Sequence, residues 1–497
     1  MTNRGVVAAL MGALMMVATG CSEECENASD CSDKGSAGEG KAWVCRANAC
    51  VAEGTSPTPA PDSGTPTTPD AGTPGDAGTP GDAGTPGDMT IAEGGACTTS
   101  ASCMAGLYCE TQTCKPLHLA LTERVGTGTS AKDRAVVVYY KTPGQATPPA
   151  AVTALSEDTA GTSRFPRWSK DGTTLAFENK ASDNTVALWS RTLPLTAGQK
   201  TELVTGSLAG TDEFRYMEWA PSANIAWSKT TGGSTTGISY LANATGTVQV
   251  GTTAGVFPSW AADGNSFAYS ANGQGVKIKS ITTGADGVVS GPPTTAEQPL
   301  YNRVNNVLLF LSVKAASDVE TFGGVSTPLT SLYTFQPPAA GGTAGTPATI
   351  AETRTESTDA GGSVKSYIFN HTWSPRGTHV AYVRVNYYKP TTGDAVLCNG
   401  TNCGGTQGNV LFVRAVDPTT GAPQGDEIKF SNESTLPSFS DDGYFLAYVS
   451  GSKLQVQKLN PAGTTEATLK DGTAFSHAWG NVQTNRGDDS RPRWQPR

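Results

Sequence analysis

One short unit recurs along the chain, and it limits the possible folds more than any other feature. Residues 165–177 read FPRWSKDGTTLAF: an apolar run ending in Trp168, a turn containing Asp171 and Gly172, and a second run of the form aliphatic-Ala-aromatic. The unit returns, with variation in the turn, at residues 217–227, 257–269, 371–382 and 436–448, and residues 302–310 keep only its second half. Because glycine tolerates a positive φ in a tight turn, the unit predicts a β-hairpin.

A second pair of strand-like runs follows each hairpin. VALW at 186–189 and VLFV at 410–413 are rich in β-branched and aromatic residues, and a weaker run such as EIKF at 427–430 comes after a turn. Four short antiparallel strands that repeat every roughly 40 to 70 residues are typical of a β-propeller blade. The sequence therefore predicts an all-β fold, a β-propeller of four-stranded blades.

A near-copy of the first half of the unit lies at Pro492-Arg493-Trp494. Residues 134–140 (RAVVVYY) fit the second strand of a blade that has no first strand before it, and residues 151–155 fit the third. We expect these segments to form one composite blade, so that pairing of C-terminal and N-terminal strands closes the ring and removes exposed sheet edges. This gives about seven blades; the count is six if residues 302–310 are an insertion and eight if residues 475–479 begin another blade.

The repeated hairpin resembles the WD-like Trp-Ser-Pro-Asp-Gly repeat of TolB propellers and of the propellers that precede prolyl oligopeptidase domains. The resemblance covers residues 117–497, with Lys170, Ala262 and Asp441 where the family has proline. It implies the fold but not the activity, because one scaffold serves many functions. The separate N-terminal α/β domain of TolB has no counterpart here, and cysteine-rich segments stand in its place.

The N-terminus has the pattern of a lipoprotein signal peptide. Arg4 precedes an apolar run, residues 5–17, that is shorter than the about 20 residues a membrane span needs. The run leads to Val-Ala-Thr-Gly-Cys21, which resembles a bacterial lipobox. We expect residues 1–20 to be removed and Cys21 to be lipidated. The lipid would anchor an exported chain to a bacterial membrane. The outer membrane is favoured, and the sequence does not distinguish its periplasmic side from the cell surface. The alternative is an ordinary secretory signal with Cys21 as an unpaired thiol.

Two cysteine clusters follow, in segments 21–53 and 91–117. Both have the spacing C-x5-C-x(n)-C-x4-C, formed by Cys25, Cys31, Cys45 and Cys50 and then by Cys97, Cys103, Cys109 and Cys114. Segments this short bury too little apolar surface to fold unaided, so disulfides are expected after export. Zinc is the alternative, although neither cluster contains histidine. The chain has 11 cysteines, and excluding Cys21 leaves an even number, with Cys398 and Cys403 as a further pair.

Composition divides the chain further and excludes one class of partner. Residues 54–90 contain a repeated Asp-Ala-Gly-Thr-Pro-Gly unit and few apolar side chains, which predicts a disordered linker between the two modules. The propeller then occupies residues 118–497. A formal charge of −9 without a block of basic residues argues against binding of nucleic acid.

The sequence shows no catalytic constellation. It contains no Gly-x-Ser-x-Gly motif, and Asp171, Asp263 and Asp442 stand in turns, where an aspartate bonds to its own backbone. His371 with His477 is the one combination that suggests a metal site in the channel; the alternative is a pair of strand-end imidazoles. We expect no cofactor and no metal.

The predicted function is therefore that of a non-enzymatic, membrane-anchored lipoprotein whose propeller binds a protein of the cell envelope. The loop closed by Cys398 and Cys403 is a candidate contact point for a partner, or else a loop stiffened against proteolysis. The alternatives are an enzyme of lyase or hydrolase type with its site in the channel, and a receptor for a small ligand or glycan.

Overall fold

The computed structural model describes residues 41–46, 49–54 and most of 91–496. The gaps in the last range are 99–101, 105–106, 111, 128–130, 140–152, 157–159, 196–197, 206–211, 223, 232–233, 242–247, 251–254, 272, 290, 314–318, 323–324, 339–344, 358–360, 477–481 and 485–486. The chain divides into two compact units, Met1–Thr85 and Pro86–Arg497. In the first unit, strands β1 (Lys41–Arg46) and β2 (Ala49–Gly54) form an antiparallel hairpin in which Cys45 lies opposite Cys50.

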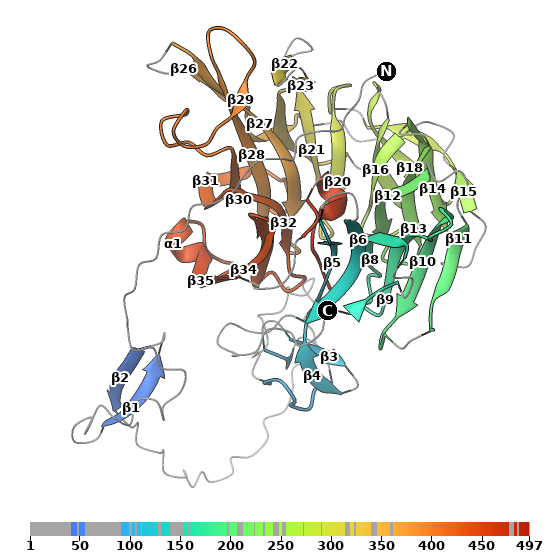
Figure 1. Ribbon diagram of the computed structural model, residues 1–497, viewed down its shortest axis with the longest axis vertical. Helices are drawn as coiled ribbons and strands as arrows, with labels where there is room; N and C mark the ends of the chain where they lie inside the picture. The colour runs from blue at the N-terminus through green and yellow to red at the C-terminus, as the bar shows by residue number, and fades with distance from the viewer. Residues whose placement is uncertain are drawn as a thin grey trace, which may run out of the picture. The chain divides into compact units, whose positions relative to one another are not determined.

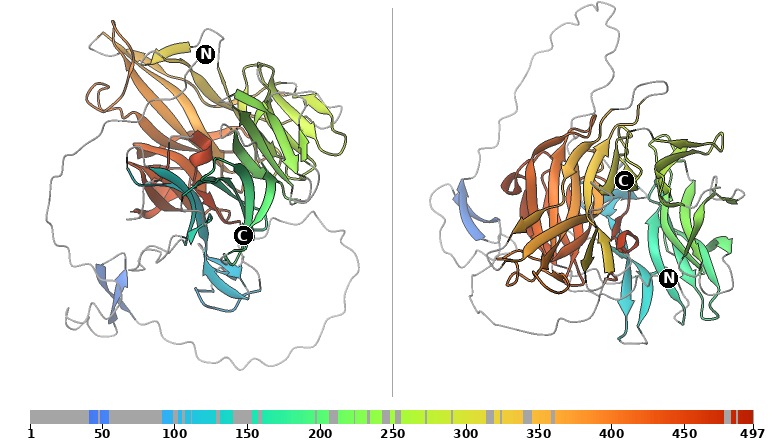
Figure 2. Two further views of the ribbon diagram at one scale, coloured as in Figure 1. Left: turned by 45° about the vertical axis from the view of Figure 1, so that its right-hand side comes forward. Right: turned by 90° about the horizontal axis from the view of Figure 1, so that it is seen from above.

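The second unit contains a short hairpin and seven larger sheets. The hairpin consists of β3 (Leu107–Glu110) and β4 (Thr113–Pro116), with Cys109 opposite Cys114. The sheets stand around a common centre, as Figures 1 and 2 show, and each has a path of four antiparallel strands. The chain is therefore a seven-bladed β-propeller.

We number the blades in chain order and give their strands from the innermost outward. They are blade 1, β36 (Arg493–Trp494), β5 (His118–Val125), β6 (Lys132–Tyr139) and β7 (Thr153–Ala154); blade 2, β8 (Thr162–Trp168), β9 (Thr174–Lys180), β10 (Val186–Thr192) and β11 (Thr201–Thr205); blade 3, β12 (Asp212–Trp219), β13 (Ile225–Thr231), β14 (Ser234–Leu241) and β15 (Val248–Val250); blade 4, β16 (Gly255–Trp260), β17 (Ser266–Ala271), β18 (Gly275–Ser280) and β19 (Asp286–Val288); blade 5, β20 (Glu297–Tyr301), β21 (Leu308–Val313), β24 (Thr330–Phe335) and β25 (Ala348–Ala351); blade 6, β27 (Ser363–Trp373), β28 (His379–Lys389), β30 (Asn409–Val416) and β31 (Pro423–Asn432); and blade 7, β32 (Ser434–Phe439), β33 (Phe445–Ser450), β34 (Lys453–Leu459) and β35 (Lys470–Ser476). A short helix, α1 (Glu466–Leu469), precedes β35.

The hydrophobic core lies between the blades. Successive residues of a strand point to opposite faces of its sheet. In β21, Leu309 and Leu311 pack against blade 6, whereas Leu308 and Phe310 pack against blade 4. This two-sided burial explains why the middle strands are continuous apolar runs rather than alternating ones. Seven such clusters occur, one at each junction between neighbouring blades.

The ring closes through the C-terminal strand, as predicted. In β36, Arg493 pairs with Ala120 and Trp494 pairs with Leu119. Figure 1 shows β5 and β6 between β32 and β8, so blade 1 stands between blades 7 and 2. The predicted fold class, a propeller closed by pairing of C-terminal and N-terminal strands, is confirmed.

The strand assignment within blade 1 was wrong. We expected residues 134–140 to be the second strand, but β6 is the third strand and β7, within residues 151–155, is the fourth. The second strand is β5, directly after the second cysteine module. Its residues Leu119 and Leu121 pack against blade 7, in the role that an aliphatic-Ala-aromatic run has elsewhere.

The blade count of seven excludes both alternatives. Residues 302–310 join β20 to β21 and complete blade 5 rather than inserting into another blade. Phe475 lies in β35, the outermost strand of blade 7, and so does not begin an eighth blade.

Blades 5 and 6 carry additional β-structure, which we call the blade 5–6 crest. Both β27 and β28 are 11 residues long, and their outer halves also pair with β26 (Thr355–Ser357) and β29 (Val396–Leu397). A second hairpin, β22 (Val319–Phe322) and β23 (Val325–Pro328), projects from blade 5 on the same side of the ring (Figure 1). Glu320 on this hairpin forms ion pairs with Lys365 and Lys389 of blade 6, which hold the two parts together.

Candidate functional site

The innermost strands place an aromatic residue at the same position of every blade, and most of these residues are tryptophan. Each indole N–H donates to a backbone carbonyl of the preceding blade at 3.0 to 3.1 Å. The pairs are Trp168 with Arg493, Trp219 with Arg167, Trp260 with Glu218, Trp373 with Leu300, and Trp494 with Ser438. The tryptophans therefore join blades, and Trp494 extends the same bond across the closure.

A β-bulge interrupts the inner strand three residues before the aromatic position. The residues there have φ between +51° and +60° in blades 2 to 7, although none is glycine: Phe165, Tyr216, Phe257, Gln298, Asn370 and Leu436. The pairing register with the second strand shifts at the same place. The bulge frees backbone N–H groups for contacts outside the sheet: that of Phe165 donates to Thr122 Oγ1, and that of Tyr216 donates to Asp489 Oδ1.

The C-terminal segment passes through the centre of the ring before it forms β36. A single 3-10 turn, η5 (Gly487–Ser490), lies there and is the red helical turn at the middle of Figure 1. Asp489 is completely buried and bonds to Arg167 and Arg215 of blades 2 and 3. Arg491, also buried, donates to the carbonyl of His371 in blade 6 at 2.9 Å. The segment thus connects opposite sides of the channel and fills this part of it.

A cavity of about 190 Å³ lies in the channel, beside the carboxyl ends of the inner strands. Its charged lining includes Arg303, Arg491 and Arg493 together with Glu218 and Asp441. Arg303 lies 3.8 Å from Glu218, the distance joining a guanidinium nitrogen and a carboxylate oxygen. A cavity of this size has room for a small polar molecule.

Burial shifts the pKa of Glu218, which lines this cavity, and that of Lys170, which is paired with the lining residue Asp441. It raises the pKa of Glu218, an effect that the positive charges of Arg303 and Arg493 oppose. It lowers the pKa of Lys170, as does Arg303, whereas Asp441, 3.9 Å away, raises it. Shifts of this kind occur both at catalytic sites and in structural networks of ion pairs.

The described histidines bond to protein groups. His371 Nε2 lies 2.8 Å from the carbonyl of Gln298, and His379 Nε2 lies 3.0 Å from that of Gly463. His118 Nδ1 lies 2.6 Å from Gln495 Oε1 of the C-terminal segment. The metal-site alternative required His477, which lies outside the described residues, so the pair with His371 stays untested.

The three turn aspartates have the role that the sequence predicts. The carboxylates of Asp171, Asp263 and Asp442 accept the backbone N–H two residues further on, at 3.0, 2.9 and 3.1 Å. Each therefore stabilises its own turn.

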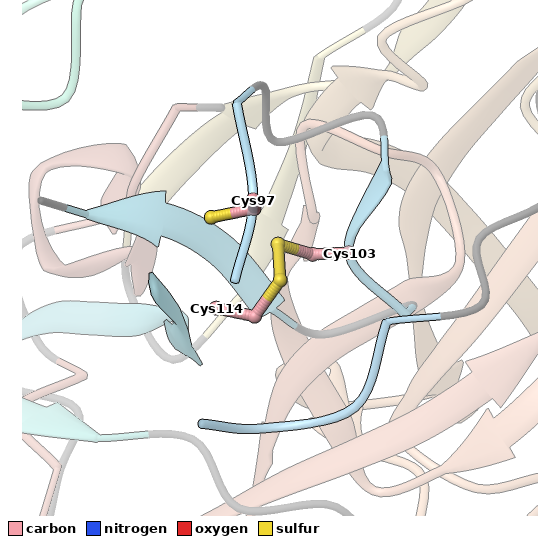
Figure 3. A group of neighbouring side chains, drawn as sticks. All are labelled: Cys97, Cys103 and Cys114. Atoms are coloured by element: carbon pink, nitrogen blue, oxygen red, sulfur yellow. A yellow bond between two sulfur atoms is a disulfide. The ribbon is translucent and has the colours of Figure 1, made fainter. Parts of the chain in front are cut away.

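The cysteines in the described part of the second module form two disulfides, Cys97–Cys109 and Cys103–Cys114. Figure 3 shows Cys97 beside the bond that joins Cys103 and Cys114. The sulfur atoms of this group lie close enough together to suggest a metal site, but a disulfide sulfur is not the thiolate that zinc requires.

Cys398 and Cys403 form a third disulfide, between the second and third strands of blade 6. Cys21, Cys25 and Cys31 lie outside the described residues, as does most of the predicted linker.

Sequence reasoning missed the charged residues of the channel. Arg167 and Arg493 directly precede the aromatic position in their copies of the repeated unit. Since that position lies on the innermost strand, the sequence could have indicated that both arginines face the channel. No sequence feature indicated that Asp489 is buried, because two adjacent aspartates after a glycine are typical of an exposed turn.

The strand order and the closed ring define the class of protein, a seven-bladed β-propeller. Neither a protein-family model nor a curated protein sequence matches the chain.

Solved structures similar to the chain include proteins of different kinds. TolB from Acinetobacter baumannii is 13% identical, with 77% of this chain and 67% of that one covered and a TM-score of 0.37. Oligogalacturonate lyase from Vibrio parahaemolyticus is 12% identical over 75% and 88%, with a TM-score of 0.41. Hydrazine synthase from Kuenenia stuttgartiensis is 12% identical over 59% and 76%, with a TM-score of 0.38. Identities and TM-scores this low do not indicate which of these functions, if any, this chain shares.

Proposed function

We propose that this protein is an exported lipoprotein, anchored through Cys21, whose propeller binds a protein of the cell envelope and catalyses no reaction. The signal-like N-terminus and the predicted linker support the anchor and a tether. Among the described residues, no helix has the length and apolar character needed to span a bilayer.

The blade 5–6 crest is the observation that carries the binding proposal. Val319, Val396 and Leu397 are 49%, 50% and 40% exposed, and all three lie on the crest. Val396 and Leu397 are adjacent in β29, and contiguous exposed apolar surface is typical of a protein interaction site. The ion pairs of Glu320 and the Cys398–Cys403 disulfide hold the crest in place, which reduces the entropy lost on binding.

The test combines cross-linking in intact envelopes with substitutions on the crest. We expect a cross-linked protein to be recovered with the wild-type chain and to be lost from a Val396→Asp, Leu397→Ser variant. Val304→Asp is the matched control, since Val304 is 51% exposed and lies in blade 5 away from the crest strands. Equal recovery from both variants would exclude the crest as the binding surface.

The membrane anchor has a separate test. Cys21→Ser should move the chain from the membrane fraction to the soluble fraction and remove the mass of the acyl chains from its N-terminal peptide. A variant that stays in the membrane fraction would contradict lipidation at Cys21.

A second candidate function uses the channel. The 190 Å³ cavity, with a raised pKa at the lining residue Glu218, suits a small-ligand or glycan receptor or an enzyme of lyase or hydrolase type. Elemental analysis of the propeller after incubation with divalent metals, together with thermal shifts on addition of sugars, separates this candidate from the first. Stoichiometric metal or a saturable shift, with no cross-linked protein, would favour it.

A further inference from the structure

A buried charged contact in the channel joins inner strands to a segment that is far away in the chain. Asp489 Oδ2 accepts from Arg215 Nε at 2.9 Å, and Asp489 Oδ1 accepts from the backbone N–H of Tyr216 at 2.6 Å and from Arg167 Nη2 at 3.3 Å. Arg167 Nη1 also lies 3.4 Å from the backbone carbonyl of Asp489. Both carboxylate oxygens are thus bound, and the side chain is 0% exposed.

Contacts that do not involve Asp489 hold these donors in place. Arg167 Nε donates to the carbonyl of Met217 at 2.9 Å, and its Nη1 donates to that of Pro166, so the junction of blades 2 and 3 fixes this guanidinium. The bulge at Tyr216, with φ of +53°, takes its N–H out of the strand ladder. Arg215 lies over the ring of Tyr216, 4.7 Å from the centroid. Donors held in position before a ligand arrives are the property of a binding site.

The charge of the site also suits an anion. Burial alone would lower the pKa of Arg215, but the negative charge of Asp489 raises it above its ordinary value. Glu213 is the other acid paired with Arg215, at the longer distance of 3.9 Å. Glu213 also pairs with Arg164, at 3.0 Å, so removal of Asp489 takes the close carboxylate away from Arg167 and Arg215, an unfavourable change for buried charges.

We propose that Arg167, Arg215 and the backbone N–H of Tyr216 form a carboxylate-binding site in the channel, which Asp489 occupies as an internal ligand. The chemical class of ligand is a carboxylate, bound through one N–H···O bond to each of three donors. A free carboxylate of the same size occupies these donors when the side chain of Asp489 is absent. This inference concerns a site apart from the crest and does not depend on the crest binding a protein.

The test uses acetate, because acetate consists of the atoms that Asp489→Gly removes. At pH 7 we expect this variant of the full chain to melt about 5 °C below wild type, as expected when one partner of a buried charge pair is deleted. We expect a Kd in roughly the millimolar range for so small a ligand, so sodium acetate at about 100 mM should nearly saturate the site. It should recover at least half of the loss in melting temperature. Sodium chloride at equal ionic strength and acetamide should not.

Three controls decide between this site and a general effect of acetate. Wild type, in which the site is filled, should show no acetate-specific shift. Asp489→Asn keeps the volume of the side chain and should not respond to acetate. The double variant Asp489→Gly, Arg215→Gln lacks one donor and should recover less than a third as much as the single variant.

Each remaining outcome also decides the question. Equal responses of wild type and Asp489→Gly to acetate, or equal responses of the variant to acetate and chloride, would overturn the proposal. If the variant does not fold in chloride, refolding in acetate supports the site, and failure to fold in both salts overturns it. Cross-linking through the crest is unaffected by any of these results, so the two proposals fail separately.

Discussion

The contribution of Trp494 to ring closure can be tested by two substitutions. Trp494 is 6% exposed and packs in the cluster shared by blades 7 and 1, its ring 5.9 Å from that of Phe445. Trp494→Ala removes this packing, which costs about 3–5 kcal/mol for a buried aromatic residue. It also leaves the carbonyl of Ser438 without its indole donor, which adds about 1 kcal/mol. We expect a loss of about 4–6 kcal/mol, a large part of the about 5–15 kcal/mol typical of a folded domain.

Trp494→Phe keeps an aromatic ring but deletes the donor and the five-membered ring of the indole. It should cost at least about 1 kcal/mol and less than Trp494→Ala, as should Trp260→Phe, which removes the equivalent 3.0 Å bond to the carbonyl of Glu218 inside the chain. Denaturant unfolding followed by circular dichroism measures all three variants without relying on the deleted fluorophore. A loss below about 1 kcal/mol for Trp494→Ala would show that the terminal strand is not packed in the ring and would refute the reasoning.

Two further perturbations have defined outcomes. Gly172→Ala should destabilise the chain more than Gly443→Ala by at least about 1 kcal/mol. Both glycines have a positive φ in equivalent turns, but only at Gly172 would an added Cβ lie 2.5 Å from the carbonyl oxygen of Pro496. Equal losses for the two variants would contradict the close approach of the C-terminal segment. Burial lowers the pKa of His379, so the imidazole binds a proton more tightly in the unfolded chain than in the folded one, and stability should fall as pH drops below about 6.5. His379→Gln should flatten the dependence of the melting temperature on pH between about 5 and 7. Parallel curves for wild type and the variant would contradict this prediction.

The sequence predicted the blades because each one repeats a local pattern. An aromatic residue, an Asp-Gly turn and an aliphatic-Ala-aromatic run lie within a dozen or so residues, so no distant contact is needed to recognise them. The second strand of blade 1 was missed for the opposite reason. The run HLALTERV has no hairpin turn and first strand before it, since its first strand is supplied from the other end of the chain.

The channel residues were beyond local reasoning. The acceptor Asp489 and its donor Arg215 are 274 positions apart, and Arg167 is 322 positions away. Nothing in the pattern around Asp489 indicates burial, because a Gly-Asp-Asp-Ser run is polar throughout. The same limit applies to the crest: the length of β27 and β28 was visible only after their pairing was known.

The closing strand has a consequence for biosynthesis. His118 and Gln495 are hydrogen-bonded partners 377 positions apart, so blade 1 stays incomplete until almost the whole chain has been synthesised. Until then β5 lacks its inner partner strand and the cluster shared by blades 7 and 1 lacks Trp494, and contacts of such long range form slowly. A nascent chain of this kind benefits from chaperones that keep it unfolded until its last strand is available.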